Sequence, residues 1–285
     1  MAERRSVTPT EYRDMDPAII TSNSATNITS LTTLRLREFS APTATGRCLL
    51  AQFTDREVIV YQAYKPELGN FAVENQYFGG DGFNFKRTSW IKPNFTWMMH
   101  RCGWASKQNQ EVVLALALRR DFWDNVLSQA VMSNYESYRS TMSAEVPRGD
   151  VQRRWKASLQ ASDVVMQWDP DHMPFTGHKT NHRAIQLGLR GDALAAFRGP
   201  AFGETGIQDV SAFAKATEEI HRPRAADGGG GGGHPAAPAA TSPPALLLPI
   251  EETYPVMDTS VAQRLGIDEQ ARTGFGTGGG VWVMT

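Results

Sequence analysis

A low-complexity segment from Arg222 to Ala245 sets the strongest limit on how this chain can fold. Its glycines, alanines and prolines cannot bury enough apolar surface to offset the entropy lost on ordering, so residues 222–245 are predicted to be a linker. Residues 46–221 are then expected to form one core domain. Apolar residues return after the linker, and residues 246–268 are expected to form a C-terminal element that docks back on the core.

Both ends of the chain are predicted to lie outside that domain. Residues 1–40 are rich in Ser, Thr and Pro and show neither a helical nor a strand period, which is typical of a disordered arm. Residues 269–285 are predicted to be a disordered tail. The 285 residues, 41% of them hydrophobic, are therefore expected to bury one substantial core.

Composition excludes several classes of protein. A formal net charge of −1 gives no global attraction to nucleic acid, and two cysteines are too few for a disulfide framework or a zinc site. Met1–Pro17 lacks the apolar run of a signal peptide, and the longest aliphatic run, Val112–Leu118, is far shorter than the roughly 20 residues that span a bilayer. We expect a soluble intracellular protein of the cytoplasm with no membrane partner. Its oligomeric state is left open.

Strands and helices are both predicted for the core domain. Cys48–Phe53 and Val58–Tyr64 flank the turn TDRE and predict a hairpin. Further strands are predicted at Glu111–Arg120, Asp163–Asp169 and Arg183–Leu189. Helices are predicted at Asp121–Val131 with Asp121 as its cap, at Asp150–Ser162, after Gly191, and in the stretch MDTSVAQRLGI beyond the linker. The expected fold is a single α+β domain with a mixed, mostly antiparallel sheet and packed helices.

Another helix is predicted from Pro93 to Cys102. Pro93 suits the first helical position and Gly103 suits the left-handed position after the end. Apolar residues at helical spacing predict a buried stripe made of Phe95, Met98, Met99 and Cys102. On a different face, Trp97 and Arg101 are four residues apart, a spacing that allows a cation–π contact.

The charge pattern around this helix is unusual. No Asp or Glu occurs from Gly82 to Gln110, and the basic residues of this run are Lys86, Arg87, Lys92, Arg101 and Lys107. Such a run indicates a positive surface beside aromatic side chains, which is the mixture that phosphate binding and base stacking need. A solvated basic face without any ligand is the competing interpretation.

Several stretches of the chain resemble a known family. They include VYQAY at Val60–Tyr64, TSWIKPNFTWMMHRCGWASK at Thr88–Lys107, QEVVLALALRR, VQRRWKASL, VMQWDPDH, HRAIQLGL and LLPIEETYPVMDTSVAQRLGI. These stretches resemble the domain of unknown function 4291 family, with the low-complexity linker as an insertion. The family usually has Met, Ser, Leu and Tyr at four positions that here hold Ser89, Asn94, Thr96 and His100. The resemblance implies no established activity.

Polar residues inside predicted strands are the other candidates for a site. Alternation places Gln62 and Tyr64 on one face of their strand and Tyr61 on the other. Arg183 begins an apolar strand and Gln186 interrupts it, so Gln186 either has structural partners or faces a pocket.

Two further features can be explained by structure alone. Asp169 ends a strand before Pro170, where it is either a turn residue or a general acid or base. The cluster of His172, His178 and His182 lies in a predicted loop without the spacing of a helical zinc motif, so we expect no metal there.

These features lead to one functional hypothesis and two alternatives. The hypothesis is an enzyme for a nucleotide or nucleic-acid substrate, in which Asp169 or His182 is the acid or base. The substrate-binding residues would be Gln62, Tyr64, Lys86, Lys92, Trp97, Arg101, Arg183 and Gln186. One alternative is a non-catalytic module that binds RNA or protein through the same surface, and another is a purely structural interaction protein. No cofactor is specified by the sequence.

Overall fold

The computed structural model describes residues 34–222 and 244–268, all of which belong to one unit of the chain. Most of the expected arm, almost all of the linker and the whole of the expected tail lie outside the described residues. The expected arm extends too far, because Leu36–Glu38 forms strand β1. Its partner is β11, Leu247–Pro249, more than two hundred residues later, and a pairing at that distance leaves no local signal.

One five-stranded antiparallel sheet contains the predicted hairpin. Its strands, in spatial order, are β10 (Phe202–Asp209), β6 (Val112–Arg119), β4 (Glu57–Tyr64), β3 (Leu50–Phe53) and β12 (Glu252–Thr253). β6 is buried along its length except at its last residue, as its run of Val, Leu and Ala predicts. β4 lies beside β6 and is also mostly buried. This sheet therefore places the polar side chains of β4 in the interior.

A second five-stranded sheet is mixed. β9 (Lys179–Leu189) pairs with β8 (Val164–His172), with β5 (Ser89–Ile91) and with the short β2 (Gly46–Arg47), while β7 (Val131–Met132) pairs with β8. The β2–β9 and β7–β8 pairs are parallel, whereas β8–β9 and β5–β9 are antiparallel. Together the sheets and helices confirm an α+β fold, with more strands than the sequence predicts.

The two larger sheets meet where β5 ends. The residue after β5, Lys92, pairs with Tyr61 of β4 in an isolated antiparallel bridge. The amide of Tyr61 donates to the Lys92 carbonyl at 2.7 Å, and the amide of Lys92 donates to the Tyr61 carbonyl at 3.2 Å. The backbone of Lys92 is thus fixed to both sheets.

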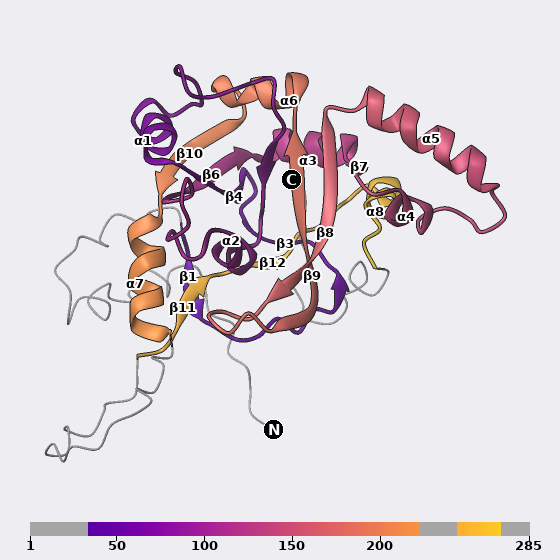
Figure 1. The fold of residues 1–285 in the computed structure, drawn as a ribbon. Coiled ribbons are helices and arrows are strands. Elements are labelled where there is room, and N and C mark those ends of the chain that lie inside the picture. The colour runs from indigo at the N-terminus through magenta and orange to yellow at the C-terminus, as the bar shows by residue number, and fades with distance from the viewer. Residues whose placement is uncertain (1–33, 223–243, 269–285) are drawn as a thin grey trace, which may run out of the picture. The chain divides into compact units, whose positions relative to one another are not determined.

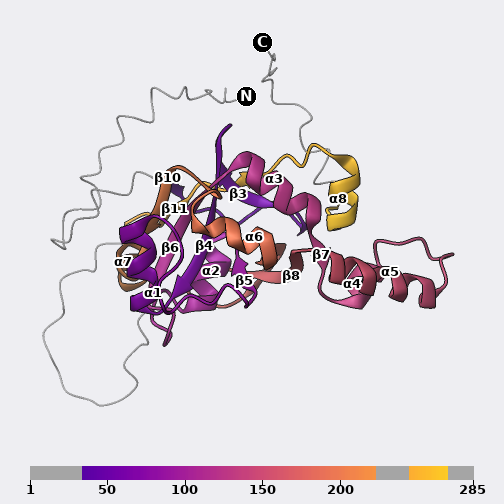
Figure 2. The same ribbon diagram turned by 90° about the horizontal axis from the view of Figure 1, so that it is seen from above.

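Eight α-helices are described, and several of them cover the sheets (Figures 1 and 2). α2 contacts β4 of one sheet and β8 of the other, whereas α5 lies beside α4 at one side of the structure. The helices are α1 (Pro66–Asn75), α2 (Phe95–Cys102), α3 (Arg120–Gln129), α4 (Tyr135–Arg139), α5 (Arg148–Ala161), α6 (Gly191–Ala195), α7 (Ser211–His221) and α8 (Thr259–Leu265). None of the helices in the described part of the chain has the length and apolar character needed to cross a membrane.

Helix α2 begins two residues later than predicted. Asn94 is its N-cap, and the Asn94 side chain accepts a hydrogen bond from the Trp97 amide at 2.7 Å. Gly103 follows the helix with φ 59°, the left-handed conformation that the sequence predicts. The apolar stripe of α2 is buried, which confirms the predicted core face.

The predicted cap of α3 is wrong. The N-cap is Arg119, the last residue of β6, because the chain passes from strand to helix without a loop. Asp121 lies in the first turn instead, and its carboxylate forms an ion pair with Arg119 at 2.6 Å.

The segment after the linker adds two strands and a helix to the structure. β11 pairs with β1, β12 pairs with β3, and α8 packs against α3. Asp258 caps α8 by accepting hydrogen bonds from the amides of Ser260 and Val261, so the predicted capped helix is confirmed. The Trp168 indole of β8 donates to the Leu265 carbonyl at 2.8 Å and ties α8 to the second sheet.

Candidate functional site

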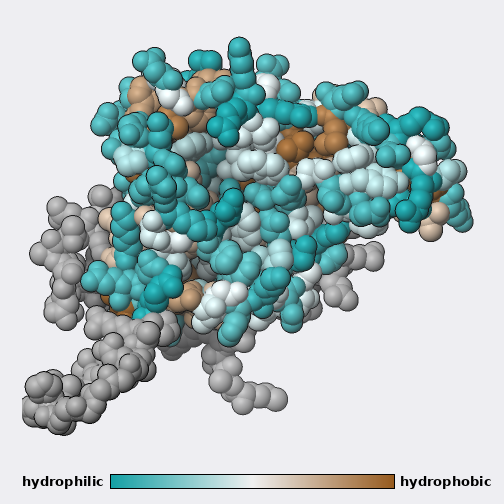
Figure 3. All heavy atoms as spheres, in the orientation of Figure 1, coloured by the Kyte–Doolittle hydropathy of each residue, from teal (hydrophilic) through white to brown (hydrophobic). Residues whose placement is uncertain are grey.

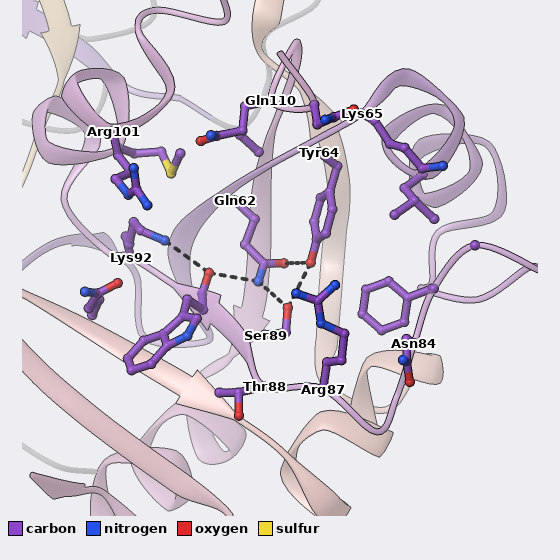
Figure 4. A pocket seen from close by; sticks show the side chains of 18 of the residues that line it. Gln62, Tyr64, Lys65, Asn84, Arg87, Thr88, Ser89, Lys92, Arg101 and Gln110 are labelled. Carbon is purple, nitrogen blue, oxygen red and sulfur yellow. Dashed lines mark hydrogen bonds between the residues drawn. The ribbon is translucent and has the colours of Figure 1, made fainter. Parts of the chain in front are cut away.

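A pocket of about 840 Å³ opens beside the junction of the two sheets (Figure 4). Its walls come from the end of β4, the start of α1, the loop before β5, β5 itself, α2, the loop before β6, and the strands β8 and β9. Four cationic side chains line it, and no Asp or Glu does. The cations are Lys65, Arg87, Lys92 and Arg101. The pocket therefore combines positive charge with neutral polar groups.

A hydrogen-bond network forms one wall of the pocket. The Gln62 amide nitrogen donates to Ser89 Oγ at 2.8 Å and to the Trp90 carbonyl at 2.9 Å. The Tyr64 hydroxyl donates to Gln62 Oε1 at 3.0 Å and lies 2.9 Å from Ser89 Oγ. Figure 4 shows these three side chains converging from β4 and β5. Burial raises the pKa of the Tyr64 phenol, so this group remains a neutral donor.

Strand alternation accounts for the placement of this network. Gln62 and Tyr64 are two residues apart on β4 and share the face that lines the pocket. Tyr61 points to the other face, where its ring packs edge-on against Phe95 at 5.3 Å between centroids. The predicted faces of the three residues are confirmed.

Lys92 is the most buried cation of the pocket, with 7% of its surface exposed. Its Nζ donates to the Trp90 carbonyl at 3.3 Å and lies 5.3 Å from the centroid of the Trp97 ring. It makes no ion pair with a carboxylate of residues 34–222 or 244–268. Burial, followed by the nearby charge of Arg101, lowers the pKa of the Lys92 amine to about 8, while Asp169 opposes this shift.

Trp97 makes a cation–π contact, but the cation is not Arg101, so the predicted pair is wrong. Lys92, which precedes the helix, lies over the indole instead. Arg101 is exposed and lines the pocket, while Trp97 is buried. The contact on Trp97 thus comes from a residue outside α2, whereas the spacing of residues within the helix had predicted one from inside it.

A carboxylate lies just beyond the pocket wall. Gln167 of β8 and Gln186 of β9 are directly paired across the second sheet, and both line the pocket. The Gln186 amide nitrogen donates to Gln167 Oε1 at 2.9 Å and to Asp169 Oδ2 at 2.7 Å. Burial raises the pKa of Asp169, although the Gln186 hydrogen bond and the charges of Arg183, Lys92 and Arg101 oppose it. Asp169 is thus close enough to the pocket cations to influence them.

The structure brings five of the ten proposed site residues together in the pocket and leaves the other five outside its lining. The five are Gln62, Tyr64, Lys92, Arg101 and Gln186, with Asp169 in contact through Gln186. Lys86 and Arg183 are exposed elsewhere, Trp97 is buried below Lys92, and His182 is buried in the second sheet.

The His182 ring is held on both sides. Its Nε2 donates to the Cys48 carbonyl at 2.7 Å, and its Nδ1 lies 3.1 Å from Asp171 Oδ2. His182 belongs to β9, not to the loop that the sequence suggests, because the β8–β9 ladder continues across an irregularity between Pro170 and His172. Within the described residues, no three His, Cys, Asp or Glu side chains are grouped as metal ligands would be.

Several pocket residues were missed by sequence reasoning. Gln167 interrupts an apolar strand just as Gln186 does, so the same rule would have found it. Ser89 accepts a hydrogen bond from the Gln62 amide, and its signal was its place within a stretch that resembles a known family. Lys65, by contrast, lies outside the run from Gly82 to Gln110 that lacks acidic residues, and no sequence feature marked it as a pocket residue.

The fold and site define an α+β protein with a cationic pocket that no carboxylate lines. Residues 48–229 match the family described as Domain of unknown function (DUF4291), and the chain belongs to that family. A comparison with curated proteins found no match.

Proposed function

We propose that the protein binds a phosphate-bearing small molecule of nucleotide size in the pocket beside Lys92. The observation that carries this proposal is the lining, in which four cations and no acid surround one cavity. Arg and Lys are the residues that bind phosphate groups, through charge-assisted hydrogen bonds from guanidinium and through the ammonium charge. The carboxylate-free lining favours an anion over a cation as the bound group.

The size and the neutral side chains of the pocket support a nucleotide in particular. A volume of about 840 Å³ lies in the range of about 300–1,000 Å³ typical of small-molecule sites. Phe83 and Trp90 in the lining offer ring surface against which a base can pack. The amides of Gln110, Gln167 and Gln186 offer donors and acceptors for its polar edge.

We further propose that the pocket is catalytic, with Asp169 as the group that exchanges protons with the substrate. A half-buried carboxyl whose pKa is raised stays protonated to a higher pH than an exposed one, so it can both give and take a proton. His182 is not the acid or base in this proposal, because both of its ring nitrogens already have partners, Asp171 and the Cys48 carbonyl, and it serves to hold the backbone of the second sheet. Binding of an RNA or a protein through the same basic surface, without turnover, is the alternative that the binding test separates.

The test is calorimetric titration of the purified protein with ATP, AMP and adenosine. We expect ATP and AMP to bind more tightly than adenosine, and Arg101→Gln to weaken ATP binding by about 10- to 100-fold, since a hydrogen bond to a charged group contributes about 1.5–3 kcal/mol. Lys156→Gln, an exposed charge on α5, is the matched control and should leave binding unchanged.

Two results would count against this proposal. Equal affinity of wild type and Arg101→Gln for ATP would show that ATP does not bind in this pocket. Binding of RNA alone, weakened steeply by salt and without affinity for mononucleotides, would favour the non-catalytic module.

A further inference from the structure

Lys92 is held in an environment that disfavours its ammonium form relative to that of an exposed lysine. Its side chain passes over the Trp97 ring, and its Nζ has one backbone acceptor, the Trp90 carbonyl, at the long distance of 3.3 Å. An ammonium group carries three donor hydrogens, so this single contact leaves most of its donor capacity directed to the pocket. Figure 4 shows the Lys92 amine reaching inward between Arg101 and Gln62.

The charged groups around this amine come from two elements. Arg101 on α2 repels the protonated form, and Asp169 on β8 attracts it from behind Gln186. Cys102, the other titratable neighbour, is buried on α2 with a raised pKa and stays a neutral thiol. Desolvation combined with a cationic neighbour is the arrangement by which proteins turn a lysine into a nucleophile near neutral pH.

We propose that Lys92 is a nucleophilic amine that forms an imine with the carbonyl carbon of a phosphorylated aldehyde or ketone. The inference rests on the proposed function, because Lys65, Arg87 and Arg101 are assigned to the phosphate of the same ligand. It adds the chemical class of the substrate, which the binding proposal leaves open. Carbonyl chemistry is favoured because it needs only the amine, the ligand and a proton-transfer group.

The reaction balances with the amine, the ligand and Asp169, which lies behind Gln186 at the edge of the pocket and exchanges its proton through one intervening water molecule. The lone pair of Lys92 Nζ attacks the carbonyl carbon, the new C–N bond forms, and the carbonyl oxygen takes a proton from the Asp169 carboxyl group. The nitrogen returns one proton to Asp169, and the carbinolamine then loses its hydroxyl group together with its remaining N–H hydrogen as one molecule of water, which leaves the C=N bond. The products are an imine and water, without any oxidant, reductant or other reactant.

The experiment is reductive trapping with glyceraldehyde 3-phosphate and sodium cyanoborohydride, followed by peptide mass mapping of every lysine. Glyceraldehyde, which lacks the phosphate, is the matched probe. We expect Lys92 to be modified at least tenfold faster by the phosphorylated probe than by glyceraldehyde, and faster than the exposed Lys156. Inorganic phosphate should protect Lys92, and the rate should fall as the pH drops below about 8.

Variants separate this inference from the binding proposal. Lys92→Arg cannot form an imine and should lose the adduct, whereas Lys156→Arg, an exposed change on α5, should keep both the Lys92 adduct and the affinity for ATP. Modification of Lys65 and Lys156 with none at Lys92, or equal rates with both probes, would overturn the imine proposal. If ATP still binds in that case, the proposed nucleotide binding is kept and only the imine proposal is rejected. A phosphate-dependent Lys92 adduct without ATP binding would support the imine and reject the nucleotide.

Discussion

The ammonium group of Lys92 lies in a buried position that disfavours its charge. Its pKa is lowered because burial and Arg101 both disfavour the protonated form. A lysine of this kind lowers the stability of the fold at neutral pH, so a ligand-binding or chemical role gives a physical reason for its presence.

Replacement of Lys92 by Met should therefore stabilise the protein at pH 7. The folded-state pKa of about 8 lies below the ordinary value of 10.5, so the penalty is complete below about pH 8, shrinks as the pH rises, and is absent above 10.5. At about 1.4 kcal/mol for each pKa unit, the gain in unfolding free energy is up to roughly 3 kcal/mol. Urea denaturation at pH 7 and pH 10.5 measures it, and a less stable Lys92→Met at pH 7 would contradict the expectation.

At the same scale, the sequence predicted some side-chain positions well and others poorly. The period of two along β4 is a local property, and it placed Gln62 and Tyr64 correctly. The cation over Trp97 comes from Lys92 because the bridge between Lys92 and Tyr61 fixes that backbone, and spacing within one helix carries no information about such a bridge.

The N-terminus of α2 is completed by a residue from beyond the linker. Glu251 accepts a hydrogen bond from the Phe95 amide at 2.5 Å and another from the Asn94 side chain at 2.8 Å. A carboxylate at this end of a helix satisfies amides that have no partner in the helix and complements its dipole. Since α2 carries Met98 and Arg101 of the pocket, Glu251 helps to fix the pocket wall.

Loss of the Glu251 carboxylate should destabilise the fold and loosen this wall. Glu251→Ala leaves the Phe95 amide and the Asn94 side chain without their acceptor, and we expect it to lower the unfolding free energy by about 1–3 kcal/mol. Glu251→Gln keeps one acceptor oxygen and should lose less. Thermal denaturation of both variants, with ATP titration at a temperature where they are folded, separates lost stability from a displaced Arg101.

The same residue predicts a pH dependence. Burial, opposed by the Phe95 and Asn94 donors, raises the pKa of Glu251 above its ordinary value of 4.5. The unfolded chain therefore releases this proton more readily, and the stability contributed by protonated Glu251 is lost as the pH rises from 4.5 through the folded-state pKa. Because the amide of Glu251→Gln does not titrate, the difference in unfolding free energy between wild type and this variant should change in favour of the variant as the pH rises across that interval. A difference between the two proteins that is constant with pH would contradict this assignment.

Element boundaries show where local signals end. Asp169 before Pro170 predicts the end of a strand, yet β8 continues to His172. On one side of β8, the strand β7 pairs only with Val165 and Met166. At Pro170 β8 therefore has no strand partner on that side, and the missing amide of the proline breaks no hydrogen bond to β7. Helix α2, in contrast, has both of its end signals within a few residues, and its C-terminal boundary was predicted correctly.

At the scale of the whole described structure, the segment after the linker contributes to two of its three sheets. β12 extends the β3 edge of the first five-stranded sheet, and β11 forms the separate pair with β1. Val261 and Leu265 of α8 belong to the main core cluster. The face in Figure 3 is covered mainly by hydrophilic residues, as expected when the apolar side chains of these elements are packed inside.

A chain that ends before Pro244 should therefore lose its cooperative fold. Truncation removes β11, β12 and α8 and exposes the core surfaces that they cover. The matched control ends after Asp268, retains all of these elements and should melt close to the full chain. Circular dichroism with thermal melting compares the three proteins. A cooperative transition in the shorter chain at the temperature of the full one would show that the segment is dispensable.

The position of Glu251 also has a consequence for the order in which the protein is made. Every residue that lines the pocket leaves the ribosome before Glu251 does, since the last of them in the chain is Gln186. A nascent chain that stops within the linker already carries the complete set of pocket side chains but lacks the carboxylate that holds the start of α2. We therefore expect the wall of the pocket that α2 forms to become fixed only after translation has passed Glu251.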